Sequence, residues 1–488
     1  MNRAERLARL LRVLAAIIAE PGLNPLELAD RAGVSERTLR RDLAELRDLG
    51  YDVAYTSGYE VQEKLNLEGR GKSRPRHRGD DALLQAVAQA VESAGLWRDT
   101  EQAEAPRKSR PRKAGPAPLV LIPGGETDAD FIYATGFSVE TAAYIRFPDG
   151  DDVLLATPLE IDRARAQARA KRIVEDREAY AHKSWARSAA RLLREAGFTQ
   201  ARVSPNMRAV QLEDLRAQGL DVEVDRDLFV AERRHKSPEE ADAIRQAQEA
   251  AESAVIEVVR ELARAEINDG LLWSDGRPLT SEHLYATAQL RLGEKGFTCP
   301  DMIIAGSPEN ALPHYRGEGP IKANEPVIID IFPTSRQTHY SGDLTRTVVV
   351  GEVSDGVRKM HAAVLQALDA GIESIAAGVP GKEPHAAVCQ VLVDRGFGTT
   401  STGFEGPEGV ARMNHSTGHG VGLDIHEEPA LRETTESPLE AGDVVTVEPG
   451  LYLLGLGGVR VEDTGMVTKQ GFQNFTTLTR SLDPRDYL

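Results

Sequence analysis

The sequence predicts a multidomain α+β protein. Its 488 residues are too many for one hydrophobic core and enough for three. Helical periodicity near the amino terminus gives way to alternating strands and helices from Pro118, and then to strand-turn-strand segments between Asp330 and Glu462. We therefore expect three folded parts, the first of them joined to the rest by a linker.

The amino-terminal part is expected to contain three helices followed by a hairpin. Apolar residues at helical spacing, from Leu7 to Ile18, predict an amphipathic helix over residues 3–20. Asn24, Pro25 and Glu27 then supply an N-cap, a first-turn proline and a capping glutamate, which predict a short helix to residue 32. A third helix is expected over residues 35–49 and a hairpin over residues 51–61.

The segment LADRAGVSERTLRRDLAELRDLGY resembles the winged helix-turn-helix of DeoR-type bacterial regulators. Its apolar spacing would pack the second and third helices together through Ala29, Gly33, Val34, Leu39, Leu43 and Leu46. The resemblance implies that the third helix enters the major groove of DNA. The candidate DNA contacts are Ser35, Arg37, Thr38, Arg40 and Arg41.

Charge is distributed unevenly along the chain. Residues 1–78 carry 15 Lys and Arg against 12 Asp and Glu, a net charge of +3. Because the whole chain carries −17, residues 79–488 carry −20. Phosphates would attract the first part and repel the second. DNA is therefore the expected partner of the amino-terminal part, and a protein-contact or dimerisation module is the alternative.

Residues 67–117 are expected to form a linker that contains one helix. The basic, proline-containing runs RGKSRPRHR and RKSRPRK flank a predicted helix over residues 80–96. Their low apolar content and repeated positive charge predict a flexible tether. From residue 118 to about 234, strands at LVLIP, TAAYIRF and DVLLAT alternate with helices, of which two are expected near residues 161–170 and 184–196.

Two pairs of acidic residues flank a histidine-rich run, NHSTGHGVGLDIHEE, at residues 414–428. Strands at 327–330 and 344–350, joined by the turn-rich residues 333–342, would bring Asp330 and Asp343 together. Strands at 444–448 and 458–462, joined by a Gly/Pro turn, would make Glu448 and Glu462 face each other. With one histidine, these acids form the oxygen-rich ligand set that suits two divalent ions. A solvated hairpin carboxylate is the alternative for each acid taken alone.

The motifs HSTGHGVGLDIHEEP, TVEPGLY, RVED and SGDLTRTVVVG resemble the pita-bread metallopeptidases, which include aminopeptidase P, prolidase and methionine aminopeptidase. The segments ADFIYATGF and ERRHKSPEEADAIRQA resemble the start and the exit of the amino-terminal domain in creatinase and prolidase relatives. The resemblance covers roughly residues 118–467. With the regulator resemblance, it implies four parts: a winged helix-turn-helix at 1–66, the linker at 67–117, a creatinase-type α/β domain at 118–236 and a pita-bread α+β catalytic domain at 237–488.

The resemblance also implies a role for each ligand. Asp330 would chelate one ion, His419 and Glu448 would bind the other, and Asp343 and Glu462 would bridge the two. Carboxylate-rich ligation favours Mn²⁺ or Co²⁺, with Zn²⁺ as the alternative. The distances of 29 residues from His419 to Glu448 and 14 from Glu448 to Glu462 resemble the compact prolidase form. The 13 residues from Asp330 to Asp343 exceed the usual family spacing, so the loop at 333–340 is a candidate to reshape the pocket.

Further roles follow from hydrolysis at such a centre, which requires a proton acceptor and a group that stabilises the oxyanion. Glu448 is the candidate proton shuttle. By resemblance, His426 and His314 would contact the scissile carbonyl or the peptide amine, and His415 would line the substrate pocket. Arg460 would pair with a substrate carboxylate or with an acidic ligand. A strand-surface arginine is the alternative for Arg460.

We therefore expect a metal-dependent Xaa-Pro dipeptidase or aminopeptidase, fused to a DNA-binding domain, that acts on short proline-containing peptides. The family resemblance suggests a homodimer. One alternative is a transcriptional regulator whose peptidase-like domain senses a small ligand without turnover. Another is hydrolysis of a different C–N bond, as in creatinase, although that metal-free relative lacks the five ligands retained here.

Localisation is expected to be cytoplasmic, with no membrane partner. No apolar run approaches the roughly 20 residues that span a bilayer. Residues 1–20 contain Arg12 within their apolar stretch and show no cleavage signature. Cys299 and Cys389 are the only cysteines, which suits a reducing compartment.

Overall fold

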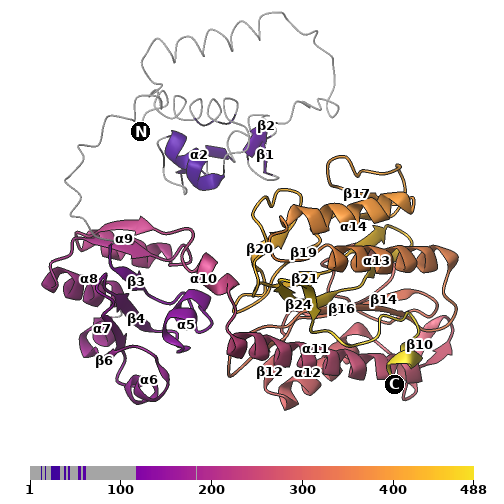
Figure 1. Cartoon of the computed structure of the whole chain (residues 1–488), viewed down its shortest axis with the longest axis horizontal. Helices are drawn as coiled ribbons and strands as arrows, with labels where there is room; N and C mark the ends of the chain where they lie inside the picture. The colour runs from indigo at the N-terminus through magenta and orange to yellow at the C-terminus, as the bar shows by residue number, and fades with distance from the viewer. Residues whose placement is uncertain are drawn as a thin grey trace, which may run out of the picture. The chain divides into compact units, whose positions relative to one another are not determined.

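The chain forms two compact units, Met1–Lys113 and Ala114–Leu488 (Figure 1). The computed structural model describes residues 117–182 and 184–488. In the amino-terminal unit it describes residues 13, 17, 24–32, 34, 38–39, 42–43, 53–55 and 59–61. The expected linker helix at 80–96 and four of the candidate DNA contacts, Ser35, Arg37, Arg40 and Arg41, lie outside the described residues.

The described part of the amino-terminal unit contains the predicted short helix and hairpin. Helix α2 spans Pro25–Ala32. Its start is capped reciprocally, because the Glu27 N–H donates to Asn24 Oδ1 (3.1 Å) and the Asn24 N–H donates to Glu27 Oε2 (2.9 Å). Strands β1 (Val53–Tyr55) and β2 (Tyr59–Val61) form an antiparallel hairpin. The buried core consists of Val13, Ile17, Leu28, Ala29, Ala32, Leu39 and Leu43, so the predicted packing of Ala29, Leu39 and Leu43 is confirmed.

A six-stranded mixed sheet with helices on both faces begins the second unit. Its strand order is β6-β5-β4-β3-β7-β8. The element order confirms the predicted alternation of strands and helices. Apolar residues of the strands pack into one core on each face of the sheet. The elements are β3 (Leu119–Leu121), α5 (Ala129–Thr135), β4 (Ala142–Arg146), β5 (Asp152–Ala156), α6 (Ile161–Gln167), β6 (Arg172–Glu175), α7 (Arg177–His182), α8 (Trp185–Glu195), β7 (Gln200–Val203), α9 (Ala209–Ala217) and β8 (Asp221–Val224). The short helix α10 (Val230–Arg234) follows this sheet.

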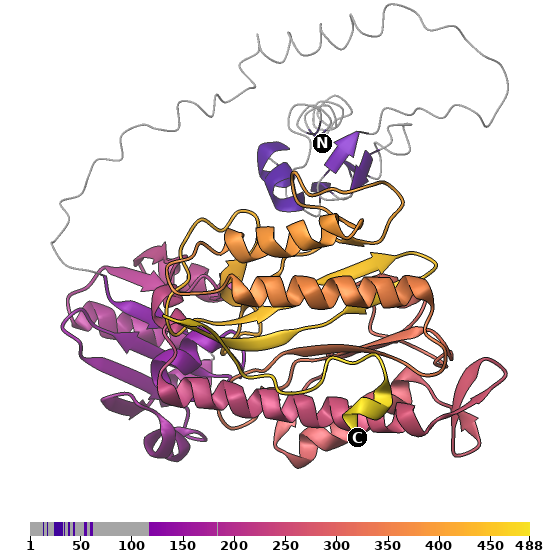
Figure 2. The ribbon, with the colours of Figure 1, turned by 45° about the vertical axis from the view of Figure 1, so that its right-hand side comes forward.

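The rest of the unit places curved sheets between two pairs of helices (Figure 2). Helix α11 (Pro238–Arg264) starts at a capping box of Ser237 and Glu240 and packs with α12 (Ser281–Glu294) against one apolar core. Helices α13 (Asp355–Glu373) and α14 (Lys382–Asp394) cover a second core on the other side of the strands. The shorter elements are β9 (Glu266–Asn268), β10 (Leu271–Ser274), β11 (Arg277–Pro278), β12 (Phe297–Thr298), β13 (Ile303–Gly306), β17 (Gly398–Thr399), β18 (Arg412–Met413) and β25 (Gly471–Asn474).

The first predicted hairpin is present. Strands β14 (Pro326–Ile331) and β16 (Leu344–Val349) pair antiparallel, with Asp330 opposite Thr345. The connection contains a short strand, β15 (Thr334–Ser335), that pairs with β12. Gly342 allows the end of this connection to approach helix α11 closely, because a Cβ there would lie 2.6 Å from the Gln248 nitrogen.

The second predicted hairpin is more complex than a strand, a turn and a strand. The expected turn between Glu448 and Glu462 itself contains a strand, so four strands are present: β21 (Val444–Val447), β22 (Gly450–Leu453), β23 (Gly457–Arg460) and β24 (Asp463–Thr468). β21 pairs with β24 in a five-stranded sheet, whereas β22 pairs with β23 in a four-stranded one. Pro449, which has no N–H to donate, lies between β21 and β22 and interrupts the pairing there. Glu448 and Glu462 lie at the two breaks.

The histidine-rich run forms a third hairpin. Strands β19 (Gly418–Gly420) and β20 (Glu427–Leu431) pair antiparallel, and residues 421–426 connect them. β19 also pairs with β21, so the histidine hairpin lies next to the glutamate-bearing strands.

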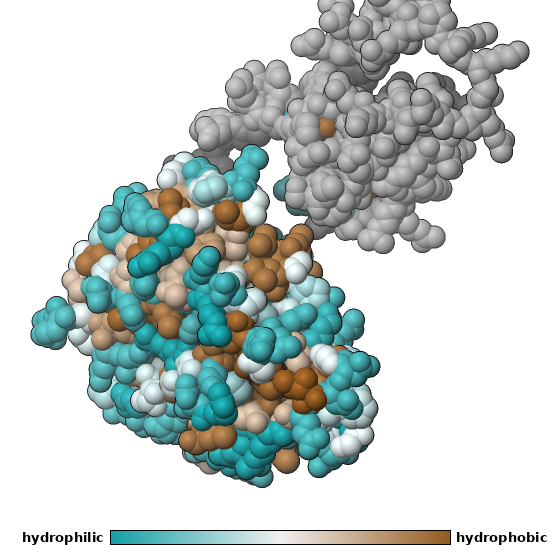
Figure 3. Space-filling view, turned by 90° about the vertical axis from the view of Figure 1, so that its right-hand side faces the viewer, coloured by the Kyte–Doolittle hydropathy of each residue, from teal (hydrophilic) through white to brown (hydrophobic). Residues whose placement is uncertain are grey.

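Apolar and polar side chains are interspersed on the described surface. Exposed apolar side chains such as Leu159, Leu290 and Leu454 occur at separate points in the sequence, and the face in Figure 3 shows brown groups among teal and white ones. Among the described residues, no helix is long and apolar enough to cross a membrane.

Candidate metal centre and active site

A cavity of about 880 Å³ is lined by residues of all three hairpins. Every side chain that the sequence predicts for the metal and substrate site lines it: His314, Asp330, Asp343, His415, His419, His426, Glu448, Arg460 and Glu462. Folding therefore brings together residues that lie up to 148 positions apart in the sequence. Apolar side chains of Ile303, Phe332 and Ile425 complete part of the wall.

Three of these residues form a compact group of possible metal ligands. One ligand atom each of Asp343, His419 and Glu462 lies within 4.8 Å of the other two. Asp343 and Glu462 are almost fully buried, with 5% and 1% of their surface exposed. Burying carboxylates side by side is costly unless they are protonated or a cation neutralises them.

The carboxyl pKa values show this cost. Burial, together with Asp330 and Glu448, raises the pKa of Asp343 well above its ordinary value. Burial, together with Asp343 and Glu448, has the same effect on the pKa of Glu462. Burial also raises the pKa of Glu448 to about 8. The protein's own cations therefore do not offset the cost of ionising these three carboxyl groups.

Glu462 shows a specific need for a further partner. Thr345 Oγ1 donates to Glu462 Oε2 at 2.8 Å. The other oxygen, Oε1, is buried, and no hydrogen-bond partner for it is found in the described part of the chain. A buried unpaired carboxylate oxygen beside other acids fits a cation site.

The His419 ring is oriented for coordination. Its Nδ1 lies 3.1 Å from the Gly420 carbonyl oxygen. Because a carbonyl only accepts, Nδ1 carries the hydrogen and Nε2 retains its lone pair. Nε2 lies 3.6 Å from Asp343 Oδ2 and 3.5 Å from Glu448 Oε1. Burial, followed by the neighbouring His426, lowers the pKa of His419 to about 4, so the ring is neutral at pH 7.

Arg460 is a buried structural cation, which excludes the strand-surface alternative. Its exposed fraction is 3%. Nη2 donates to Asp330 Oδ2 at 2.6 Å, Nη1 donates to the Tyr452 hydroxyl at 2.7 Å, and Nε donates to Thr345 Oγ1 at 3.3 Å. Of the two predicted partners, the structure supplies the acidic residue Asp330. Each guanidinium nitrogen is engaged within the protein.

His415 lines the cavity, but both of its ring nitrogens are engaged. Nδ1 donates to the Ser416 carbonyl oxygen at 2.8 Å, so Nε2 accepts from the Tyr452 hydroxyl at 3.0 Å. Burial, followed by the Arg460 charge, lowers the pKa of His415 to about 4. A chain of hydrogen bonds thus runs from Arg460 through Tyr452 to His415, and it fixes the ring that faces the cavity.

His426 and His314 differ from the other two histidines because they are exposed to solvent. The His426 ring packs edge-on against His419, with 4.2 Å between the ring centroids. Although the ring reaches solvent, its partial desolvation in the cavity wall, followed by the nearby His314, lowers the pKa of His426 below its ordinary value. No described residue forms a hydrogen bond with a ring nitrogen of either histidine. Both rings therefore present free polar atoms to a molecule in the cavity.

Several residues that the sequence analysis missed hold the ligands in place. Gln248 on α11 fixes the Asp343 backbone, because Asp343 N–H donates to Oε1 and Nε2 donates to the Asp343 carbonyl, both at 2.9 Å. Arg346, which is fully buried, donates to the Glu462 carbonyl and to Asp463 Oδ1. Tyr452 lies within TVEPGLY, but its role depends on Arg460 and His415.

Most of the long connection between Asp330 and Asp343 lies outside the cavity lining. Phe332 lines the cavity, but none of the residues 333–342 does. Tyr340 instead donates to Glu240 on α11, and Ser341 N–H donates to the Gly422 carbonyl at 2.9 Å. The loop at 333–340, the candidate to reshape the pocket, thus lies outside the cavity lining and contacts helix α11, and the residue after it, Ser341, contacts the histidine hairpin.

Comparison with known proteins agrees with this arrangement. Residues 242–469 match the model of metallopeptidase family M24, and residues 9–60 match a model described as an HTH domain. The chain is 32% identical over 250 residues to the Xaa-Pro dipeptidase of Pyrococcus horikoshii, a match that spans 51% of this chain and 64% of that protein.

Solved structures show the same fold. The prolidase from Pyrococcus horikoshii OT3 aligns with a TM-score of 0.62 at 24% identity, covering 75% of this chain and 95% of that one. The Xaa-Pro dipeptidase from Bacillus anthracis aligns with a TM-score of 0.64 at 25% identity, covering 75% and 94%. The M24 family is metal-dependent, and the cluster of Asp343, His419 and Glu462 is a fitting site for an ion. The chain thus contains a metallopeptidase family M24 region at residues 242–469, with the fold of the prolidases, and an amino-terminal HTH match at residues 9–60.

Proposed function

We propose that this protein is a dinuclear-metal-dependent Xaa-Pro peptidase, a dipeptidase or aminopeptidase that acts on short peptides. The observation that carries the proposal is the buried cluster of Asp343, His419 and Glu462, in which Glu462 Oε1 has no partner among the described residues. The Xaa-Pro specificity is inferred from the relatives that carry that name.

The proposed ligands are those that the motifs predict. Asp343 and Glu462 would bridge two ions, His419 and Glu448 would complete one site, and Asp330 would belong to the other. Mn²⁺ or Co²⁺ suits these oxygen-rich donors, and Zn²⁺ is the alternative. Bound ions would polarise the scissile carbonyl and lower the pKa of a water molecule.

The chain's own groups would perform the remaining steps. Glu448, whose carboxyl lies 3.5 Å from His419 Nε2 in the cavity wall, would accept the proton of the attacking water and deliver it to the departing amine. His426 and His314 have free ring nitrogens and would hydrogen-bond the scissile carbonyl or the peptide amine. Arg460 would orient Asp330, and His415, held by Tyr452, would shape the substrate pocket.

For the amino-terminal part we propose a winged helix-turn-helix that binds DNA through Ser35, Arg37, Thr38, Arg40 and Arg41. The HTH match, the capped helix α2 and the β1–β2 hairpin support this. We further propose the four-part division at residues 1–66, 67–117, 118–236 and 237–488, together with a homodimer of the catalytic parts.

The peptidase proposal is tested on purified full-length protein loaded with Mn²⁺ or Co²⁺. A panel of Xaa-Pro, Xaa-Ala and Xaa-Pro-Xaa peptides should show turnover only where proline is second, and Glu448→Gln should abolish it. If the metal-loaded wild type cleaved no member of the panel, the alternative of a ligand-sensing regulator would replace the peptidase.

A further inference from the structure

Four consecutive basic residues, Arg233–Lys236, each contact acidic groups of the catalytic part. Arg234 Nη2 lies 2.7 Å from Asp443 Oδ2, and His235 Nε2 lies 2.7 Å from Glu440 Oε2. The outer two residues reach a different place. Arg233 and Lys236 both contact Glu427, the residue that directly follows His426.

Glu427 is held through both of its carboxylate oxygens. Oε2 accepts from Arg233 Nη2 at 2.5 Å, and Oε1 accepts from Lys236 Nζ at 2.6 Å. The side chains of Glu427, Arg233 and Lys236 are 9%, 11% and 3% exposed, so little water screens these contacts.

Arg233 also contacts acids on either side of this pair. Its Nη2 donates to Asp424 Oδ2 at 2.7 Å, two residues before His426. Its Nη1 donates to Asp130 Oδ1 at 3.3 Å, on helix α5. One guanidinium thus joins both flanks of His426 to a residue outside the catalytic part, a geometry that the single ammonium group of a lysine would not reproduce.

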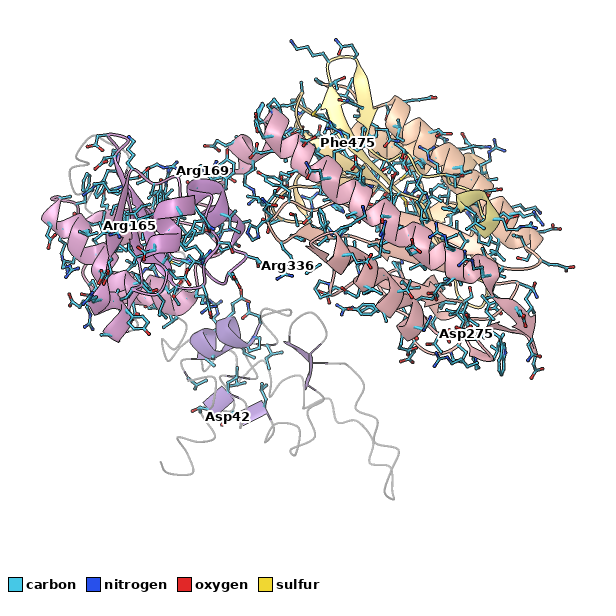
Figure 4. All side chains as sticks on the ribbon, turned by 90° about the horizontal axis from the view of Figure 1, so that it is seen from below. Asp42, Arg165, Arg169, Asp275, Arg336 and Phe475 are labelled. Carbon is cyan, nitrogen blue, oxygen red and sulfur yellow. The ribbon has the colours of Figure 1, made fainter. Side chains whose placement is uncertain are left out.

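The other side of the His426 connection is covered by apolar packing. Val421 lies in a cluster with Ala241 and Ile244 of α11, Val444 and Phe475, and Ile425 packs against it. Phe475, labelled in Figure 4 next to α11, also carries the Arg245 guanidinium 4.8 Å from its ring centroid. The connection is therefore fixed by ion pairs on one side and by apolar contacts on the other.

His426 depends on this support because its own ring is not anchored. No ring nitrogen of His426 has a hydrogen-bond partner among the described residues, and the ring's recorded contact is the edge-on packing against His419. A group that must meet a reacting atom loses much of its effect when displaced by about 1 Å. The backbone that carries His426 must therefore be held by its neighbours.

We propose that Arg233 and Lys236 are positioning residues for His426, and that through Arg233 the domain containing Asp130 contributes to the active site. The proposal rests on the peptidase function proposed above. Two residues of the RRHK sequence would then affect catalysis as well as hold the chain against the catalytic part.

The matched comparison is between Arg233 and Arg234, which are neighbours on helix α10. Arg233→Gln should lower kcat by about 10- to 100-fold with KM changed by less than about twofold and bound metal unchanged. Arg234→Gln removes a comparable ion pair, that of Arg234 with Asp443. It should therefore lower the melting temperature but leave kcat within about twofold. Arg233→Lys should restore only part of the loss. Equal losses of kcat in the Gln variants of Arg233 and Arg234 would make Arg233 a general stabilising residue and overturn the proposal.

A double-mutant cycle tests whether Arg233 acts through His426. In a His426→Ala background, Arg233→Gln should reduce kcat by less than about threefold, because the group that it positions is already absent. An undiminished effect would overturn the proposal. If Arg233→Gln does not fold, Asp424→Asn replaces it, since Asp424 is 47% exposed and its loss leaves no fully buried carboxylate unpaired.

Hydrogen exchange of the segment 421–428 gives a readout that needs no activity. Arg233→Gln should accelerate exchange there, and Arg234→Gln should not. If the wild type hydrolyses no peptide but this difference is found, the peptidase proposal fails while the positioning contact stands. Unchanged exchange in Arg233→Gln would overturn the positioning role even in an active enzyme.

Discussion

Arg460 and Asp330 form a buried ion pair, 2.6 Å from Nη2 to Oδ2, in the wall of the cavity that holds the acidic cluster. The two residues lie 130 positions apart in the sequence. The remaining guanidinium nitrogens donate to Tyr452, Thr345 and the Pro313 carbonyl, so Arg460 is held within the protein where it orients the Asp330 carboxylate.

The first prediction follows from this pair. Arg460→Lys should lower kcat/KM for Xaa-Pro dipeptides and for their carboxamides by the same factor, because we expect Arg460 to act through Asp330 and not on the substrate carboxylate. It should also weaken metal binding, because Asp330 loses its fixed orientation. Steady-state kinetics on both substrate series measures the first effect and metal titration the second. A loss confined to the free-carboxylate substrates would instead make Arg460 a substrate-binding residue.

A second prediction concerns metal content. The purified wild type should bind about two divalent ions per chain, because five ligands with two bridging carboxylates exceed what one ion requires. Asp343→Ala and Glu462→Ala should each lose both ions, since each removes a bridge. Glu428→Gln, which changes an exposed carboxylate in the cavity wall, is the matched control and should keep both. Elemental analysis after dialysis decides, and metal-free wild type after Mn²⁺ or Co²⁺ loading would contradict the site.

The third prediction separates ligand from catalyst among the histidines. His426→Ala should lower kcat by about 100-fold while leaving metal content intact, as expected for loss of one oxyanion donor. His419→Ala should lose metal, because His419 Nε2 faces Asp343 and Glu448. Metal analysis beside turnover measurements checks both variants. Loss of metal from His426→Ala would show that the two roles are assigned in reverse.

A fourth prediction concerns the pH dependence of the metal-free protein. Burial raises the pKa of Glu448 to about 8, so the folded state releases between pH 7 and pH 9 a proton that the unfolded state has already released at lower pH. Folding stability must therefore fall as pH rises through this range, by about 1 kcal/mol for this group. Histidines do not contribute to this slope, because unfolded histidines are already neutral above about pH 7.

Thermal melts of wild type and Glu448→Gln at pH 7 and pH 9 measure this loss by difference, because the buried thiol of Cys299, whose pKa burial raises to about 12, adds a slope of the same sign to both proteins. The chelator-treated wild type should melt at a lower temperature at pH 9, and metal loading should reduce the difference because a cation stabilises the ionised carboxylates. Glu448→Gln should show a smaller difference without metal. An unchanged melting temperature across this range in metal-free wild type would contradict the raised pKa.

The clustering of the candidate site residues around one cavity was predictable from sequence because each of them lies in a short motif. His419 and His426 share one hairpin, and each acid lies at the end or break of an apolar strand. The supporting contacts were not predictable in this way. Gln248 fixes Asp343 across 95 residues, and no local pattern distinguishes it from the other polar residues of a long helix.

Strand boundaries near glycine were also missed for a physical reason. The run GLYLLGLGG between Glu448 and Glu462 reads as a turn because glycine is unfavourable inside strands. In the structure these glycines permit close packing: a Cβ on Gly458 would lie 2.3 Å from the Asn310 carbonyl oxygen. Such approaches depend on tertiary contacts, so sequence periodicity alone does not reveal the strand Gly450–Leu453.

The last prediction concerns the amino-terminal part. Full-length protein should bind duplex DNA with an affinity that falls steeply as salt rises, because phosphate contacts release counterions. If the catalytic parts dimerise, two recognition helices should select paired half-sites about one helical turn apart, and full-length protein should bind more tightly than residues 1–66. Arg37→Ala combined with Arg41→Ala should weaken binding while leaving peptidase activity unchanged, because neither residue belongs to the unit that holds the metal centre. Selection from random duplexes at near-physiological salt measures this directly. Recovery of no enriched sequence, with binding no stronger than that of residues 118–488, would identify the HTH domain as a protein-contact module.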